Sequence, residues 1–201
     1  FGIDAEFVEY ESGYFYARDN QDSKVSFKDA GAAVTKNGSN IVATASNDPG
    51  MRPANGYAMS IADVEVDPET GKIQLTDFTI FQDVGKCVNP TQVENQMQGG
   101  AVQGIGWALS EEYVYDDQGL MRNASFLDYR MPTALDLPMI GTVILETPAD
   151  DGAFGIRGVG EPPIIAPPAA IANAVHDAIG VRMTSLPMSP ERVFATMKGS
   201  L

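Results

Sequence analysis

The sequence predicts a mixed α+β fold, because strand and helix patterns follow one another without a regular βαβ period. Residues 57–85 alternate apolar and polar side chains on both sides of the turn "DPETG", which indicates a β-hairpin. Residues 90–109 carry apolar side chains at helical spacing and begin with a proline, which favours the first turn of a helix. A chain of 201 residues, 44% of them hydrophobic, is long enough to bury a sizeable core.

Before the hairpin, the pattern predicts strands, a helix and one more strand. Residues 1–24 alternate as strands do and are broken by Ser-Gly at 12–13. Residues 26–38 predict a short helix with Ser26 as its cap, and "IVATAS" at 41–46 predicts a strand.

The turn-rich stretch "NDPGMRPANG" at 47–56 is the predicted domain boundary. We assign residues 1–50 to a strand-and-helix segment that continues an upstream domain, and residues 51–201 to a C-terminal domain. The chain opens Phe-Gly-Ile-Asp, without an initiator methionine, so we expect a piece of a longer polypeptide.

Four further elements are predicted after residue 109. "EEYVYDDQGLMRN" reads as a second hairpin that turns at Asp116 to Gly119, and "GTVILET" reads as a strand. Helices are expected at about 165–180 and 190–198, the second with Ser189 as cap and Pro190 in its first turn.

The composition of the chain argues against nucleic acid and membranes as binding partners. The chain has 27 acidic and 13 basic residues, and a net charge of −14 repels both nucleic acid and anionic lipid. No apolar run has the length of a membrane span, so we expect a cytoplasmic protein. One cysteine and one histidine cannot build a disulfide framework, a zinc site or an iron–sulfur cluster within the chain. We expect Cys87 and His176 to be packed or surface residues.

The 90–109 helix has an unusual second face beside its apolar stripe. At 100° per residue, two amides, two glycines and the only tryptophan fall together: Gln96, Gly100, Gln103, Gly104 and Trp107. Glycines inside a helix cost stability, so something must approach the backbone closely there. That can be another helix packing through small residues, or a ligand hydrogen-bonded by the amides. "GIGWAL" lacks the third glycine of a dinucleotide-binding fingerprint, which excludes that class.

The stretch "GIRGVGEPPIIAPP" at 155–168 displays a single carboxylate, Glu161, between flexible and rigid neighbours. Gly155, Gly158 and Gly160 let the backbone take conformations closed to other residues and approach a partner closely, whereas Pro162 and Pro163 fix it. Two interpretations remain open. Glu161 can be an acid that stabilises the start of a helix, or a catalytic base held in place by the loop.

Three motifs resemble the C-terminal part of the molybdenum-binding subunit of the xanthine dehydrogenase / aldehyde oxidase family. They are "NPTQVENQMQGGAVQGIGWALSEEYVYDDQG", "NASFLDYRMPTALDLP" and "GIRGVGEPPIIAPPAAIANAVHDAIGVRMTSLPMSPERV". They occur in the family's order over most of residues 55–198, and the opening "FGIDAEFVEYESGYFYA" resembles the preceding segment less specifically.

The resemblance implies a role for the candidate residues. Glu161 corresponds to the loop glutamate that acts as general base in this family. Gln96 corresponds to a glutamine that contacts the pterin, although Asn95 stands where the family usually has glycine. Gln103 matches more weakly, and Gly100, Gly158 and Gly160 are expected to line the cofactor. None of the chain's residues is expected to be a metal ligand.

The resemblance also implies the cofactor and the partners. The cofactor is molybdenum-molybdopterin, in the cytosine dinucleotide form common in bacteria, with Fe-S and FAD on other subunits or domains. The partners are the remainder of the molybdenum subunit, the Fe-S and flavin parts, and a small-molecule substrate. The expected function is hydroxylation of an aldehyde or N-heterocycle with oxygen from water, by an enzyme of which this chain alone is an inactive fragment. The alternative is a non-catalytic binding or assembly module descended from that subunit.

Overall fold

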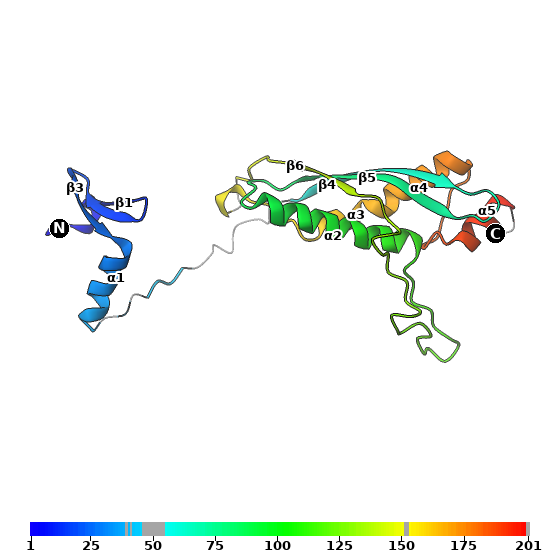
Figure 1. Cartoon of the computed structure of the whole chain (residues 1–201), viewed down its shortest axis with the longest axis horizontal. Helices are drawn as coiled ribbons and strands as arrows, with labels where there is room; N and C mark the ends of the chain where they lie inside the picture. The colour runs from blue at the N-terminus through cyan, green and yellow to red at the C-terminus, as the bar shows by residue number, and fades with distance from the viewer. Residues whose placement is uncertain (39, 41, 46–54, 151–152, 200–201) are drawn as a thin grey trace. The chain divides into compact units, whose positions relative to one another are not determined.

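The fold is given by a computed structural model that describes residues 1–38, 40, 42–45, 55–150 and 153–199. The chain divides into two compact units, Phe1–Pro49 and Gly50–Leu201. Each unit combines helices with a three-stranded sheet, which confirms the α+β class (Figure 1).

The first unit is an antiparallel sheet followed by a helix. A single 3₁₀ turn, η1 (Ala5–Phe7), comes first. The strands that follow are β1 (Val8–Glu11), β2 (Tyr14–Ala17) and β3 (Asn20–Ser26), and they are neighbours in the sheet in that order. The helix α1 (Phe27–Lys36) begins as predicted, because the Ser26 hydroxyl accepts a hydrogen bond from the Asp29 N–H at 3.0 Å.

The strand expected at 41–46 is not formed by residues 42–45, and residues 41 and 46 lie outside the described part of the chain. An isolated strand leaves its backbone N–H and C=O groups without partners, so a short apolar run without a neighbouring strand has no reason to become one.

The second unit is built on the predicted hairpin. β4 (Tyr57–Val66) and β5 (Ile73–Asp83) are antiparallel, with Tyr57 opposite Asp83. β6 (Ile140–Leu145) fulfils the predicted strand and lies parallel to β5, with Ile140 opposite Phe78. The sheet order is therefore β4-β5-β6.

Helices cover one face of this sheet. α2 (Pro90–Leu109) has the predicted bounds and contacts β5 and β6, whereas α4 (Pro167–Ile179) contacts β4 (Figure 1). The short 3₁₀ turn η2 (Ala153–Gly155) lies in the loop after β6. It is followed by the single-turn helix α3 (Pro162–Ile165), by α4 and by the last helix of the unit, α5 (Pro190–Met197). The stripe residues Met97, Ala101, Ile105 and Ala108 are fully buried in the core.

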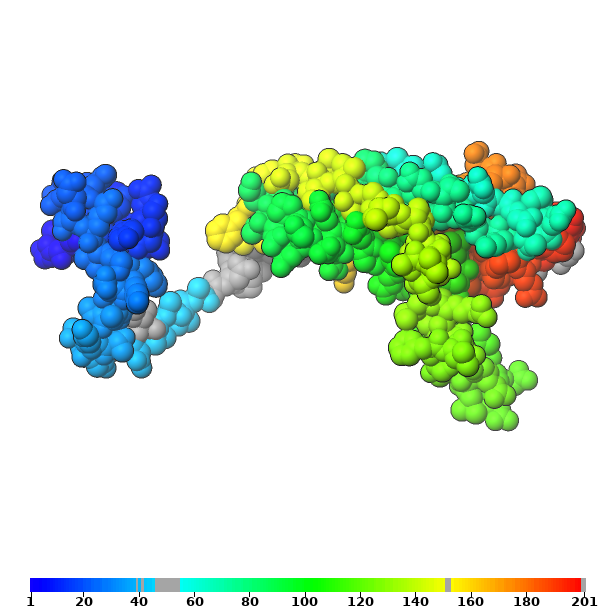
Figure 2. Space-filling view, in the orientation of Figure 1, coloured from blue at the N-terminus to red at the C-terminus, as the bar shows by residue number. Residues whose placement is uncertain are grey.

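The segment 110–139, between α2 and β6, is a long loop that projects from the body of the unit (Figure 2). The hairpin predicted here is reduced to one bridge between Tyr115 and Met121. The Asp116 carboxylate accepts the N–H groups of Gln118 and Leu120, both at 2.9 Å. A side chain that takes these backbone donors stabilises the turn and competes with a longer ladder.

Candidate functional site

Glu161 is the residue immediately before α3, and its side chain is exposed. It makes no side-chain capping hydrogen bond to the helix. α3 is one turn long, so its dipole stabilises a nearby carboxylate little. The position therefore displays the carboxylate without using it to start the helix.

The downstream side of the Glu161 loop is packed against α2. A Cβ atom built on Gly100 would lie 2.7 Å from the Cβ of Pro163, and one on Gly104 would lie 2.8 Å from the carbonyl oxygen of Ile164. The two glycines let α3 approach α2 closely, so packing through small residues accounts for both. The side of Gly100 on which a side chain would stand faces Pro163, and the expected contact of Gly100 with the cofactor stays a prediction.

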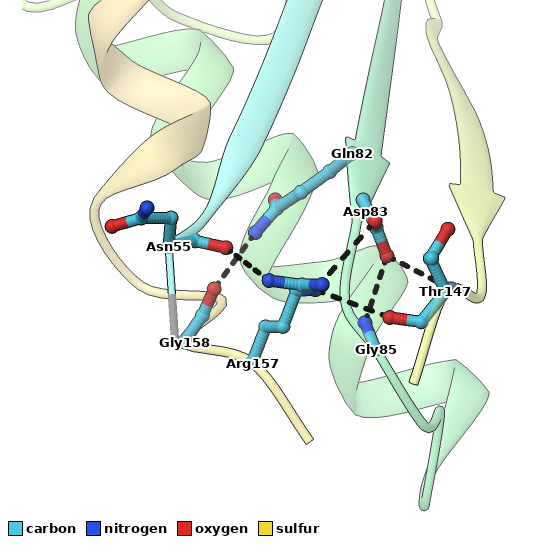
Figure 3. Close-up of polar contacts among 7 residues, drawn as sticks. All are labelled: Asn55, Gln82, Asp83, Gly85, Thr147, Arg157 and Gly158. Atoms are coloured by element: carbon cyan, nitrogen blue, oxygen red, sulfur yellow. Dashed lines mark hydrogen bonds and ion pairs between the residues drawn. The ribbon is translucent and has the colours of Figure 1, made fainter. Parts of the chain in front are cut away.

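The upstream side of the loop is held by an ion pair at the end of β5 (Figure 3). Arg157 Nε lies 3.6 Å from Asp83 Oδ2, and the two side chains are only 14% and 12% exposed. Arg157 also donates to the carbonyl oxygens of Thr147 (3.2 Å) and Asn55 (2.6 Å). Its own backbone N–H donates to the carbonyl of Val84 at 2.9 Å. Arg157 thus ties the loop to three other segments.

Asp83 is kept ionised in this arrangement. Burial by itself raises the pKa of Asp83, but the backbone N–H groups of Gly85 and Thr147 donate to Oδ1, each at 3.0 Å, and Arg157 adds positive charge. Together they hold the pKa of Asp83 below its ordinary value. Asp83 is therefore a structural anion at neutral pH, and it is not a group that exchanges protons there.

A second contact reaches the loop from the neighbouring position of β5. Gln82 is 0% exposed, and its Nε2 donates to the carbonyl oxygen of Gly158 at 3.2 Å (Figure 3). Its Oε1 is buried without a hydrogen-bond partner among the described residues. Gln82 and Arg157 therefore anchor the loop just before Glu161, as Pro163 anchors it just after.

Two of the predicted site residues, Gln96 of α2 and Gly160 of the Glu161 loop, lie beside each other. The Gln96 Nε2 lies 3.9 Å from the position of a Cβ atom on Gly160, and the Gln96 side chain is exposed. Gln103 is also exposed, farther along the same helix. A Cβ atom on Gly158 would meet nothing within 4 Å. The side of the loop next to Gln96, which we call the open flank, therefore leaves room for a flat group to approach the backbone of Gly158 and Gly160.

Of the three glycines expected to take a backbone conformation closed to other residues, Gly155 does so and Gly158 and Gly160 do not. Neither has φ in the left-handed region; in this loop that conformation belongs to Gly155 (φ 75°) and to the non-glycine Phe154 (φ 56°). Because Gly85 has no side chain, the Gly155 carbonyl packs directly against it and accepts the Lys86 N–H at 2.8 Å.

The donor set at this surface consists of amides and one carboxylate. Across the described residues, no three His, Cys, Asp or Glu side chains are grouped so that they could hold a metal ion. His176 is half-buried in the last turn of α4, and Cys87 is half-buried after β5. Hydrogen-bonding amides beside an open backbone fit a group that brings its own metal ligands. None of the described helices is long and apolar enough to span a bilayer.

Sequence reasoning missed Gln82, Asp83 and Arg157. One signal was available for Gln82: it follows Phe78 and Ile80 at the same two-residue spacing, which places a polar amide on the inward face of β5. The partners of Asp83 and Arg157 come from residues far away in the sequence, so their pairing had no local signal.

The chain is similar to known molybdenum proteins. The family model "Molybdopterin cofactor-binding domain" matches residues 1–138. The large subunit of nicotine 6-hydroxylase from Paenarthrobacter nicotinovorans is 36% identical over 96% of this chain, and the xanthine dehydrogenase molybdenum-binding subunit of Escherichia coli is 40% identical over 69%. The crystal structure of quinoline 2-oxidoreductase from Pseudomonas putida aligns with a TM-score of 0.80 and 32% identity over 97% of the chain.

These relatives are much longer than this chain. The match spans 25% of the nicotine 6-hydroxylase subunit, 18% of the xanthine dehydrogenase subunit and 26% of the quinoline oxidoreductase chain. The similarity therefore concerns one part of a large subunit.

Proposed function

Since this chain belongs to the molybdopterin cofactor-binding domain family of the xanthine dehydrogenase and aldehyde oxidoreductase large subunits, we propose that it carries the general base of a molybdenum hydroxylase. The observation that carries the proposal is the placement of Glu161. Its exposed carboxylate lies between two anchored points of a loop, next to the open flank that Gln96 borders.

In the proposed reaction, a substrate carbon gains the oxygen atom of water, and two electrons and two protons are released. The molybdenum cofactor, when bound, supplies the two-electron oxidation. The role of Glu161 is to accept a proton as the oxygen becomes nucleophilic, which is general base catalysis. The anchors matter because a misplaced base loses about a hundredfold in rate for an error of about 1 Å.

The remaining candidate residues are proposed to bind the pterin. Gln96 offers both a donor and an acceptor at the open flank, which suits a heterocycle with alternating donors and acceptors. Gly158 and Gly160 leave the backbone approachable there. Gln103, exposed on the same helix, is proposed as a secondary contact. The family model supports a pterin ligand.

The whole enzyme is proposed to contain further parts. The remainder of the molybdenum subunit would complete the cofactor site, and Fe-S and flavin subunits or domains would carry the electrons away. Relatives described as a "large subunit", a "large chain" and the "subunit gamma" of a complex support such an assembly. The bacterial origin of the relatives supports the cytosine dinucleotide form of the cofactor, which mass spectrometry of the extracted pterin would test.

The test uses the full-length protein that contains this chain. Molybdenum and pterin are quantified, and oxidation of nicotine, xanthine, quinoline and benzaldehyde is measured with an artificial electron acceptor. The proposal expects stoichiometric cofactor and turnover of at least one N-heterocycle or aldehyde. In the cofactor-loaded protein, Glu161→Gln should lower the rate of enzyme reduction by about 10²–10⁴-fold without lowering the melting temperature. A cofactor-free protein without activity would support the non-catalytic module instead, and near-normal reduction by the variant would remove Glu161 from its role.

A further inference from the structure

We infer that Gln82 is a positioning residue for Glu161, acting through the carbonyl of Gly158. The inference rests on the proposed function, because it assigns to Gln82 the task of holding the general base. It concerns a residue of β5 that does not itself border the open flank of the site.

The first argument is that Gly158 is held by a hydrogen bond from Gln82 and not by packing of a side chain of its own. Gly158 has no side chain, and a Cβ atom there would meet nothing within 4 Å, so no side-chain packing holds this residue. Its carbonyl oxygen accepts the hydrogen bond from the Gln82 Nε2 at 3.2 Å. This bond joins the end of a sheet strand to the loop three residues before Glu161.

The second argument is that the bond completes a pair of supports around Glu161. Downstream of Glu161, Pro163 is buried against Gly100 of α2. Upstream, Gly158 is tied to a strand that is buried at this point. With both supports in place, only Val159 and Gly160 separate the upstream tie from Glu161. Without the Gln82 bond, the nearest upstream tie is Arg157, and the loop between Arg157 and Glu161, which contains both Gly158 and Gly160, can bend and let the carboxylate shift.

The third argument is the cost of having an amide at this position. Gln82 is fully buried, and its Oε1 has no hydrogen-bond partner among the described residues. An unpaired buried acceptor is destabilising, and an apolar side chain of similar size would remove that penalty. Stability by itself therefore does not favour glutamine here, whereas the donor function of its Nε2 does.

The test compares Gln82→Met with a matched control in the full-length, cofactor-loaded enzyme. Gln98 of α2 is also partly buried, and its Nε2 donates to the carbonyl of Ile140 at the same 3.2 Å, away from the loop. Gln98→Met therefore removes an equivalent bond. With the fastest substrate of the panel above, Gln82→Met is expected to lower kcat at least tenfold at an unchanged KM and molybdenum content, and Gln98→Met less than twofold.

Two further measurements separate positioning from other roles. In the Glu161→Gln background, Gln82→Met should cause no further loss of kcat, because the base through which it acts is already gone. Independently of activity, amide hydrogen exchange should be faster in Gln82→Met at Arg157 and Ile164, whose N–H groups are hydrogen-bonded on either side of the loop. Gln98→Met should leave both amides unchanged.

The outcomes are distinguishable. Unchanged exchange at Arg157 and Ile164 in Gln82→Met overturns the inference whether or not the enzyme is active. An equal fold-loss of kcat with and without Glu161 also overturns it, because Gln82 would then act elsewhere. If Glu161→Gln by itself is near normal, the proposed function fails, and faster exchange in Gln82→Met would then show a loop anchor without a catalytic base.

Discussion

The amide nitrogen of Gln96 lies 3.9 Å from the place where a Cβ atom of Gly160 would be, so α2 and the Glu161 loop present one continuous surface. Gln96 comes from the first half of α2, and Gly160 comes from a loop more than 60 residues later. An exposed amide beside an uncrowded backbone suits the edge of a flat heterocycle.

Replacing Gln96 should therefore weaken cofactor binding. Gln96→Leu removes both the donor and the acceptor, and one lost hydrogen bond corresponds to about a threefold to tenfold loss of affinity. We expect the full-length variant to retain less pterin after gel filtration, as measured by fluorescence of the oxidised cofactor. Gln118→Leu, an exposed glutamine in the projecting loop, is the control. Equal retention in the two variants would remove Gln96 from the pterin site.

Replacing either of two adjacent glycines of α2 by alanine should change the stability of the protein in opposite directions. Gly99 is exposed with nothing within 4 Å of its added Cβ, so Gly99→Ala should stabilise the protein by about 1 kcal/mol through helix propensity. Gly100→Ala would place a Cβ 2.7 Å from that of Pro163, and overpacking of this kind destabilises by about 1–3 kcal/mol. Urea unfolding of both variants measures this. A stable Gly100→Ala would contradict the close contact of α2 with α3.

The Asp83–Arg157 pair predicts a pH dependence of stability. Because the pKa of Asp83 is lower in the folded protein than in the unfolded chain, its stabilisation is present above the unfolded value, about 3.9. It is lost as the pH falls from there through the folded value. Asp83→Asn should lower the free energy of unfolding by roughly 1–3 kcal/mol at pH 7, since Arg157 loses its buried partner.

The difference between wild type and Asp83→Asn should shrink as the pH is lowered below about 4. Thermal unfolding at pH 7, 5, 4 and 3 follows it. Asp128→Asn is the control, because Asp128 is exposed and, within the described part of the chain, its carboxylate is hydrogen-bonded only to Ser125, three residues earlier. A difference that stays constant across this range would show that the charge of Asp83 does not contribute.

The chain of 201 residues is expected to bind no molybdenum by itself. Its described residues offer no cluster of three metal-ligating side chains, and the proposed contacts are hydrogen bonds to an organic cofactor. Incubation with molybdate, desalting and elemental analysis should give far less than one molybdenum per chain. A stoichiometric content would mean that this chain holds the metal directly.

Local patterns were enough to predict most elements of the second unit. The hairpin, α2 and the strand at β6 each have a periodicity or a turn that depends only on neighbouring residues. Local patterns did not predict the projecting loop correctly. There the Asp116 carboxylate accepts backbone N–H groups, so that a short turn forms in place of the expected hairpin. Glu161 was found as a candidate because its glycine and proline neighbours lie next to it in the sequence.

The sequence by itself determined the fold class, the helix that carries Gln96, and the loop that displays Glu161, because each depends on interactions between residues close in the chain. Only the tertiary structure decided that β6 pairs with β5 in parallel, that Gly100 packs on Pro163, and that Gln82 holds Gly158. These contacts join residues tens of positions apart. Their partners are selected by the complete packing of the core, which no local pattern encodes.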